Sequence, residues 1–233
     1  MSHAIPKIFI TMDTDWCPAE VLQYALALFE KPALRCTIFA TGYYAALATC
    51  DSRNFEIGVH PNFNDAMVSQ YERKLRDLLA LYPNAQGVSS HAMLSSTPLL
   101  HLFKQAGLRY ERNLLRYKEV AAKPFYYFNQ LLRVPIFWED DIWFSHDPHA
   151  RFAANLFAPA DLPLVFNFHP IHLFLNTASL EHYARFKPDY HNVDKLVGHR
   201  YEGYGVHSFF QSLITYMNTQ QIACGLLSEL VTP

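Results

Sequence analysis

The sequence predicts a single-domain α/β protein over residues 1–233, an irregular (β/α) barrel with six or more strands. Three observations predict it. Short apolar segments of β type alternate with segments of helical periodicity along most of the chain. The length of 233 residues suits one domain, since such barrels often run to roughly 200–250 residues. Polar residues able to do chemistry recur where the strand-like segments end, which is the face where these barrels build their sites.

The elements follow in order. The segments expected as strands are residues 7–13, 36–41, 55–59, 135–138, 164–168 and 222–227, with 87–90 as a short segment that leads into His91. The segments expected as helices are residues 18–30, 68–82, 97–105 and 206–218. Pro18 marks the start of the first helix and Gly107 the end of the third. Residues 112–134 and 141–163 show no clear period and are expected as long loops over one face.

The composition narrows the class of protein. Hydrophobic residues make up 51% and charged residues 17% of the chain, which supplies a large core and excludes disorder. The formal net charge of −2 gives no indication of a nucleic-acid partner, and the least charged stretch, residues 162–180, is too rich in Pro, His and Asn to span a membrane. The four cysteines show no C-x-x-C spacing and are expected to be mostly buried, reduced thiols. Without a secretory signal pattern, the expected location is cytoplasmic.

Two carboxylates, Asp13 and Asp15, stand at the end of the first apolar segment. Side chains two residues apart in a strand point to the same side, so both should emerge together. Two like charges at close range are costly unless a cation or a shared proton relieves them. The pair therefore indicates either a metal site or a carboxylate base. The alternative is a turn in which Asp15 caps the helix that follows Trp16.

Other strand ends carry residues of matching chemistry. These are His60, His91, the segment from Glu139 to Asp141, and His169. Each alone fits an ordinary loop, but together they fit a site assembled from several loops of a barrel. Aspartate and histidine suit a borderline divalent metal such as zinc, with one position open to water. His146 and His149 are weak evidence for a metal and are expected in a loop.

The chain resembles the polysaccharide deacetylase (NodB-homology, carbohydrate esterase family 4) group. The resemblance lies in residues 11–15 (TMDTD), 56–60 (EIGVH) and 166–170 (FNFHP), in the order in which that family carries its motifs. Residues 60–64 (HPNFN) and 169–172 (HPIH) are similar to a nearer, divergent subgroup associated with O-antigen and other surface-polysaccharide clusters. The expected fold is accordingly a barrel of the NodB-homology type.

The resemblance implies a function and roles for residues. The function is metal-dependent hydrolysis of an N-acyl group on an amino sugar or polysaccharide precursor, and N-acetyl is the leading candidate for that group. Asp13 would be the base that activates water, and His169 the acid that protonates the leaving amine. Asp15 and His60 would bind a divalent metal, for which zinc is the leading candidate.

The chain also departs from the family pattern. Thr14 separates the usually adjacent acidic pair, and residues 90–93 (SHAM) stand where an Arg-x-Pro-Tyr motif is usual. Asn64 replaces the usual second histidine, although amide oxygen is a poorer ligand for zinc. Three resolutions are open: His91 supplies the third ligand, Asn64 or Asp65 binds a harder metal, or the site binds no metal.

Asn64, Asp140 and Trp143 are expected to contact the substrate, although most aromatic residues of such a chain are expected to lie in the hydrophobic core. Hydrolysis of a different small amide is a second hypothesis. A third is a non-catalytic protein that binds carbohydrate or assists assembly in a surface-glycan pathway. The missing histidine and Arg-x-Pro-Tyr motif favour that hypothesis, while the presence of both Asp13 and His169 counts against it. The oligomeric state is not predicted.

Overall fold

The structure, a computed structural model, describes residues 8–30, 34–127, 130–157 and 163–231. Its strands are β1 (Ile8–Asp13), β2 (Cys36–Ala40), β3 (Phe55–Val59), β4 (Gly87–Val88), β5 (Tyr110–Leu115), β6 (Phe125–Tyr127), β7 (Leu131–Ile136), β8 (Trp138–Glu139), β9 (Leu164–Phe168) and β10 (Cys224–Gly225). Its α-helices are α1 (Ala19–Ala27), α2 (Ala45–Ala48), α3 (Tyr71–Leu81), α4 (Thr97–Gln105), α5 (Asp140–His146), α6 (Pro170–Leu175), α7 (Leu180–Phe186), α8 (Val193–Val197) and α9 (Val206–Thr219).

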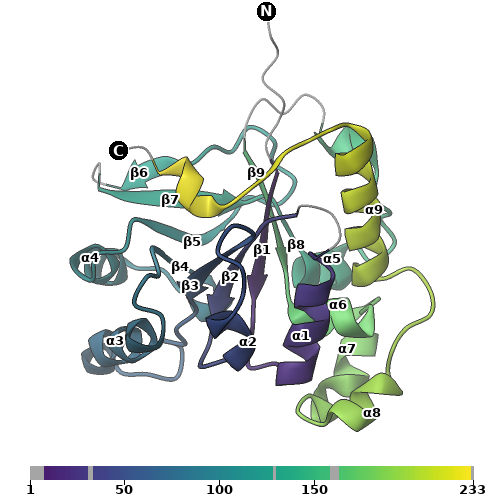
Figure 1. Ribbon diagram of the computed structural model, residues 1–233, viewed down its shortest axis with the longest axis horizontal. Helices are drawn as coiled ribbons and strands as arrows, with labels where there is room; N and C mark the ends of the chain where they lie inside the picture. The colour runs from purple at the N-terminus through teal and green to yellow at the C-terminus, as the bar shows by residue number, and fades with distance from the viewer. Residues whose placement is uncertain (1–7, 31–33, 128–129, 158–162, 232–233) are drawn as a thin grey trace, which may run out of the picture.

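The strands form one sheet that closes on itself. Its order is β7-β5-β4-β3-β2-β1-β9-β8 with parallel neighbours, while β6 pairs antiparallel with β7 and the short β10 pairs with the start of β1. Only Phe137 separates β7 from β8, and its N–H donates to the Val165 carbonyl at 2.9 Å. Residues 131–139 therefore pair with β5 on one side and with β9 on the other, which closes a (β/α) barrel. Figure 1 shows the helices around the outside of these strands.

The barrel interior has an apolar layer below a polar one. The apolar cluster is formed by Phe9, Phe39, Tyr110, Leu132, Val134, Val165 and Leu227. Because the side-chain period of a strand is two, Thr11 and Asp13 share the face of Phe9, and Asn167 shares that of Val165. These polar side chains are buried at the carboxyl end of the strands. A second, larger cluster packs the helices against the outside of the sheet. The strands thus present a buried polar layer at one mouth of the barrel.

Most expected elements are confirmed, and the strand 55–59, the helix 97–105 and the strand 164–168 have the expected bounds. The two expected loops are wrong in part, since residues 112–134 contain parts of β5 and β7 together with β6, and residues 141–163 contain most of α5. Residues 116–124 and 147–153 are irregular, as expected, and residues 128–129 and 158–162 lie outside the described part of the chain. The apolar pattern that predicts a buried strand is interrupted in β5 and β7 by charged residues, because Glu111 and Arg133 form an ion pair within the barrel. The expected last strand, 222–227, is reduced to β10. The alternative in which Asp15 caps the first helix is wrong, because Pro18 holds that position without a side-chain cap.

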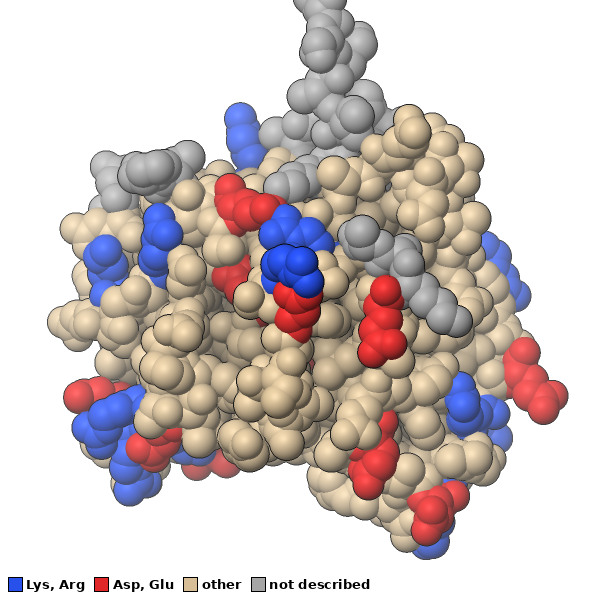
Figure 2. Space-filling model, viewed as in Figure 1, with Lys and Arg blue, Asp and Glu red and all other residues tan. Residues whose placement is uncertain are grey.

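The surface agrees with the modest net charge. On the face shown in Figure 2, basic side chains are scattered and several lie beside acidic ones. Within the ranges described, none of the helices combines the length and the hydropathy needed to cross a bilayer. None of the four cysteines, which all lie in the described part of the chain, forms a disulfide; Cys17 and Cys36 are buried, and Cys50 and Cys224 are half-buried.

Gly58, in the middle of β3, allows a close approach between strands. A Cβ atom there would lie 2.7 Å from the Phe39 ring and 2.9 Å from the carbonyl oxygen of Gly87. We expect Gly58→Ala to lower the free energy of unfolding by about 1–3 kcal/mol, because the core must shift to admit the methyl group. Urea denaturation measures the change. Gly42→Ala is the matched control, since a Cβ at Gly42 meets no atom within 4 Å. Equal stability of the two variants would contradict this account of β3.

Candidate metal centre and active site

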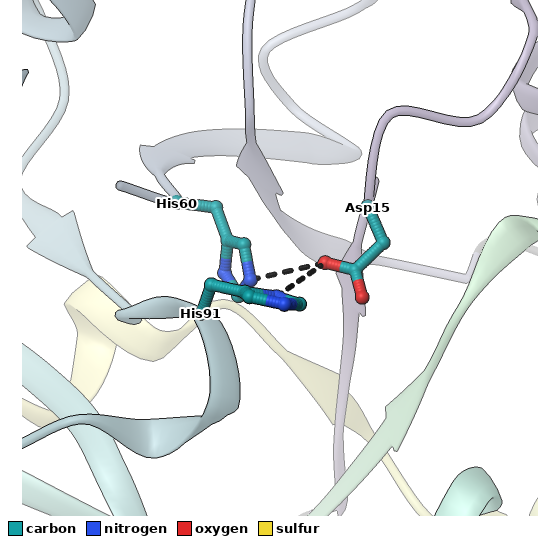
Figure 3. A group of neighbouring side chains, drawn as sticks. All are labelled: Asp15, His60 and His91. Carbon is teal, nitrogen blue, oxygen red and sulfur yellow. Dashed lines mark ion pairs between the residues drawn. The ribbon is translucent and has the colours of Figure 1, made fainter. Parts of the chain in front are cut away.

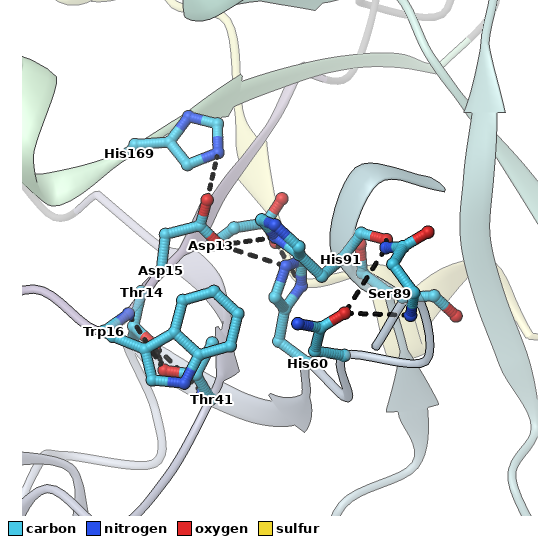
Figure 4. Close-up of polar contacts among 12 residues, drawn as sticks. Asp13, Thr14, Asp15, Trp16, Thr41, His60, Ser89, His91 and His169 are labelled. Carbon is cyan, nitrogen blue, oxygen red and sulfur yellow. Dashed lines mark hydrogen bonds and ion pairs between the residues drawn. The ribbon is translucent and has the colours of Figure 1, made fainter. Parts of the chain in front are cut away.

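The residues singled out at strand ends meet at the carboxyl mouth of the barrel (Figure 4). Asp13 is the last residue of β1, and Asp15 lies in the turn after it. His60 follows β3 directly, and His169 follows β9 directly. His91 begins a short 3₁₀ turn, His91–Met93, after β4. Four separate strand ends therefore contribute to one site.

Asp15 reaches the site through an unusual turn. The strand ends at Asp13, and Asp15 and Trp16 adopt left-handed backbone conformations, with φ of 40° and 55°. Such values are uncommon for residues other than glycine and persist where the surrounding structure enforces them. Here Thr14 donates its N–H to the Phe39 carbonyl at 3.1 Å, and its carbonyl accepts from the N–H of Cys17 at 2.9 Å. The sequence predicted that both carboxylates would lie on the same face of one strand. This prediction is wrong, because the turn brings Asp15 to the site from a different backbone direction than Asp13.

Asp15, His60 and His91 converge on one point (Figure 3). Oδ1 of Asp15 lies 3.1 Å from Nε2 of His60 and 3.3 Å from Nδ1 of His91. The Asp15 Oδ1 and His60 Nε2 atoms are buried and have no hydrogen-bond partner. A tetrahedral ion with bonds of about 2.0–2.1 Å separates neighbouring ligand atoms by about 3.3 Å, so the spacing fits a divalent metal. Backbone hydrogen bonding fixes the arrangement, since the N–H of His91 donates to the Pro61 carbonyl at 3.0 Å.

Asn64 and Asp65, the alternative sources of a third ligand, lie elsewhere. Asn64 is exposed and its amide donates to the backbone carbonyl of His91 at 2.9 Å. Asp65 is exposed and pairs with Lys74 at 2.7 Å. The geometry therefore brings His91, rather than Asn64 or Asp65, to Asp15 and His60. Asn64 supports the turn that carries His91, and its expected contact with substrate stays a prediction.

Asp13 is buried beneath this centre and held from several sides. Nη2 of Arg112 donates to both carboxylate oxygens at 2.5 Å, and the Asn167 amide donates to Oδ2 at 2.9 Å. Nδ1 of His60 lies 3.4 Å from Oδ1. Burial raises the pKa of Asp13, but Arg112 and His60 lower it more, so that the net pKa is well below its ordinary value. Asp13 is therefore an ionised carboxylate of fixed orientation.

His169 stands on the other side of Asp15, with its Nε2 atom 3.6 Å from Asp15 Oδ2. Its Nδ1 atom lies 2.6 Å from Oδ1 of Asp140, and its backbone N–H donates to Oδ2 of Asp140 at 2.7 Å. Burial lowers the pKa of His169, but Asp140 raises it more, to well above the ordinary value. The ring is therefore oriented by Asp140 and favours the protonated form.

Two expected substrate contacts do not fit the structure. Asp140 is fully buried and both its oxygens bond to His169, so it positions that ring and is not available to a sugar. Trp143 is also fully buried; its ring packs near Trp138 and Phe209, and its Nε1–H donates to the Ala150 carbonyl at 2.9 Å. Trp143 is a core residue.

Two residues that the structure places at Asp13, Arg112 and Asn167, were not among the predicted site residues. Arg112 lay in an expected loop, because the polar run from Glu111 to Asn113 carries no strand pattern, although the structure makes it part of β5. Asn167 lay inside a recognised motif. Its amide bridges Asp13 Oδ2 and Glu139 Oε1, at 2.9 and 2.8 Å, and its Oδ1 accepts from the Thr11 hydroxyl at 2.9 Å. Burial and the nearby Asp141 raise the pKa of Glu139 to about 8.

His60 gives metal binding a distinct pH dependence. Burial lowers the pKa of His60, but Asp13 and Asp15 raise it to about 9. A metal binds only the neutral imidazole, so binding at pH 7 should release about one proton, and the apparent affinity should rise with pH up to that pKa. Zinc titration calorimetry in two buffers of different ionisation enthalpy measures the proton release. Identical enthalpies in both buffers would contradict the assignment of His60, and His149→Ala, at an exposed loop histidine, should leave the release unchanged.

Comparisons with known proteins agree with this architecture. The family model described as "WbmS-like: Polysaccharide deacetylase" matches residues 10–187. Among solved structures, WbmS of Bordetella bronchiseptica, described as a polysaccharide deacetylase involved in O-antigen biosynthesis, has a TM-score of 0.82 and 32% identity, over 90% of this chain and 90% of that chain. No curated protein sequence matches the chain.

Two more distant structures share the fold alone. A family 4 carbohydrate esterase pseudoenzyme from Bacillus anthracis has a TM-score of 0.53 at 12% identity, over 98% of this chain and 66% of that chain. A family 4 acetyl xylan esterase from Clostridium thermocellum, solved with a cobalt ion, has a TM-score of 0.52 at 12% identity, over 96% and 89%. The extent of the family match and the identity with WbmS decide the classification. The chain belongs to the WbmS-like family of polysaccharide deacetylases.

Proposed function

We propose that this protein is a metal-dependent hydrolase that removes an N-acyl group, first of all N-acetyl, from an amino sugar within a polysaccharide or its precursor. One observation carries the proposal. The buried ligand atoms of Asp15 and His60, which make no hydrogen bond, meet His91 at metal-ligand spacing, between an ionised Asp13 and a His169 that favours the protonated form. The description of WbmS as a deacetylase of O-antigen biosynthesis supports the substrate class.

Asp15, His60 and His91 would hold the metal, and their donor types suit zinc. Such an ion, when bound, polarises the acyl oxygen and makes water a better nucleophile. Asp13 is the candidate base that accepts a proton from the attacking water. Arg112 and Asn167 keep its oxygens in one orientation, which spares reorganisation during the reaction. A bond then forms between the acyl carbon and the water oxygen.

His169 is the candidate acid. Its Nε2 atom faces Asp15 across 3.6 Å and is the ring nitrogen that can reach the substrate, because Asp140 engages Nδ1. As the carbon–nitrogen bond of the amide breaks, Nε2–H can donate its proton to the departing nitrogen, which leaves as an amine. Asp140 holds the ring in the tautomer and orientation that this transfer requires.

Release of free acetate tests the proposal. The full chain, loaded with zinc, is incubated with N-acetylglucosamine and with its oligomers of two and four residues. Acetate should appear with the wild-type protein, disappear after chelation and return when zinc is added. Absence of acetate from every probe while the protein holds zinc would overturn the proposal. Oligosaccharide binding without turnover, unaffected by Asp13→Asn, would favour a non-catalytic carbohydrate-binding protein instead.

A further inference from the structure

Trp16 is an exposed aromatic side chain fixed at the edge of the candidate metal centre. Its side chain is 41% exposed, and its ring meets the His91 ring edge-on, with centroids 4.9 Å apart and an interplanar angle of 75°. The backbone N–H donates to the Thr41 hydroxyl at 3.1 Å, and the Thr41 N–H in turn donates to the Thr14 hydroxyl at 2.9 Å. Figure 4 shows the indole beside Asp15 and near His60 and His91. The turn therefore holds an apolar ring face in the solvent next to the reaction centre.

Two hollows adjoin the Trp16 ring. One, of about 640 Å³, is lined by Asp15 and His91 of the candidate metal centre and also by Tyr183 and Tyr190. The other, of about 490 Å³, is lined by Pro61, Asn62 and the α3 residues Lys74, Asp77 and Leu78; among the residues that the structure describes, Trp16 alone lines both. Each volume lies within the range of ligand pockets, about 300–1,000 Å³. A sugar that reacts in the first hollow thus has a second hollow available for a neighbouring group, on the far side of Trp16.

The charges of the hollows decide what that neighbouring group is. Carboxylates outnumber ammonium groups in the lining: the former are Asp15, Asp65, Asp77 and Asp189, and the latter are Lys74 and Lys187. Lys74 is already paired with Asp65 at 2.7 Å. A nucleotide diphosphate needs a surplus of cationic or N–H groups, which the second hollow does not offer. An uncharged sugar needs an apolar ring face and scattered hydrogen-bonding groups, which Trp16 and Asn62 supply.

We infer that Trp16 is the platform for a sugar ring and that the substrate is an oligosaccharide chain extending into both hollows, rather than a nucleotide-linked monosaccharide. This inference rests on the proposed function, since it places the reacting sugar beside Asp15 and His91. The apolar face of the ring packs on the indole. The N-acyl group points into the first hollow, and the adjacent sugar occupies the second.

Tryptophan fluorescence tests the inference without turnover. The chain has three tryptophans, and Trp138 and Trp143 are both 0% exposed, so acrylamide quenching reports on Trp16. The N-acetylglucosamine tetramer should protect Trp16 from quenching. The monomer at the same concentration of sugar units, and UDP-N-acetylglucosamine, should protect it far less. Protection without acetate release would retain this binding mode while removing the proposed function, and acetate release from the tetramer without protection would overturn the binding mode alone.

Variants separate stacking from a general loss of structure. By titration calorimetry, Trp16→Ala should bind the tetramer about tenfold more weakly, and Trp16→Phe should retain most of the affinity. Tyr43→Ala is the matched control, because Tyr43 is an exposed aromatic residue that lines neither hollow. Equal affinity of Trp16→Ala and the wild type, or tighter binding of UDP-N-acetylglucosamine than of the tetramer, would overturn the inference.

Discussion

Replacement of Arg112 by alanine is expected to lower the free energy of unfolding by about 3–5 kcal/mol, because it removes the guanidinium that pairs with the buried Asp13 carboxylate. Arg112 is fully buried and its Nη2 atom is 2.5 Å from both oxygens of Asp13. It also donates to the Ser89 hydroxyl at 2.9 Å, so one guanidinium joins β1 to the segment after β4 across the barrel. Urea denaturation, followed by circular dichroism, measures the loss.

A double variant distinguishes an unpaired charge from lost packing. Arg112→Met with Asp13→Asn removes both charges and keeps much of the side-chain volume. It should recover a large part of the stability lost in Arg112→Ala, because no buried ion is left without a partner. It should not recover acetate release, since the candidate base is gone. A double variant as unstable as Arg112→Ala would show that packing, and not the ion pair, holds this layer of the barrel.

Replacement of His169 by glutamine is expected to lower kcat for deacylation by about 10²–10⁴-fold, the usual contribution of a positioned acid or base. Glutamine can still bond to Asp140 but cannot deliver a proton to the leaving nitrogen. The zinc content of the protein should not change, since the proposed ligands are Asp15, His60 and His91. Steady-state kinetics together with metal analysis measures both quantities.

His172→Gln is the matched control for that experiment. His172 is a buried histidine next to His169, with ring centroids 5.5 Å apart, but its Nδ1 atom is engaged with the Thr177 hydroxyl at 3.0 Å. Its side chain packs against Phe144. The variant should retain kcat within a few-fold of the wild type. An equal loss of kcat in both variants would mean that the effect reflects disturbed packing around α6 and not proton transfer.

Much of the site could be predicted because its residues carry local sequence signals. Asp13, His60 and His169 each follow an apolar segment of strand type, and parallel strands of a barrel bring their carboxyl ends together. The same reasoning placed His91, at the end of a segment too short to show a period. The fold class followed from the alternation of elements, which depends on local patterns alone.

The contacts of Arg112 could not be predicted in the same way. Arg112 and Asp13 are 99 residues apart and meet only because the closed barrel brings β5 and β1 to a common interior. A polar run in the sequence is normally a solvated loop, whereas here it forms a buried strand. The solvent exposure of the tryptophans could not be predicted from the sequence either. Trp143, a candidate sugar contact, packs in the core, and Trp16 remains on the surface. Closure of the barrel and the side chains around each residue decide these outcomes.

Metal content tests most directly whether Asp15, His60 and His91 form a metal centre. Protein purified without chelators and reconstituted with zinc is assayed by mass spectrometry for bound metal. The wild type should hold about one ion per chain, the stoichiometry of a single site with three protein ligands. Asp15→Ala, His60→Ala and His91→Ala should each lose it, while Asn64→Ala keeps it. No bound ion in the reconstituted wild type, or an ion retained in all three variants, would contradict the metal centre.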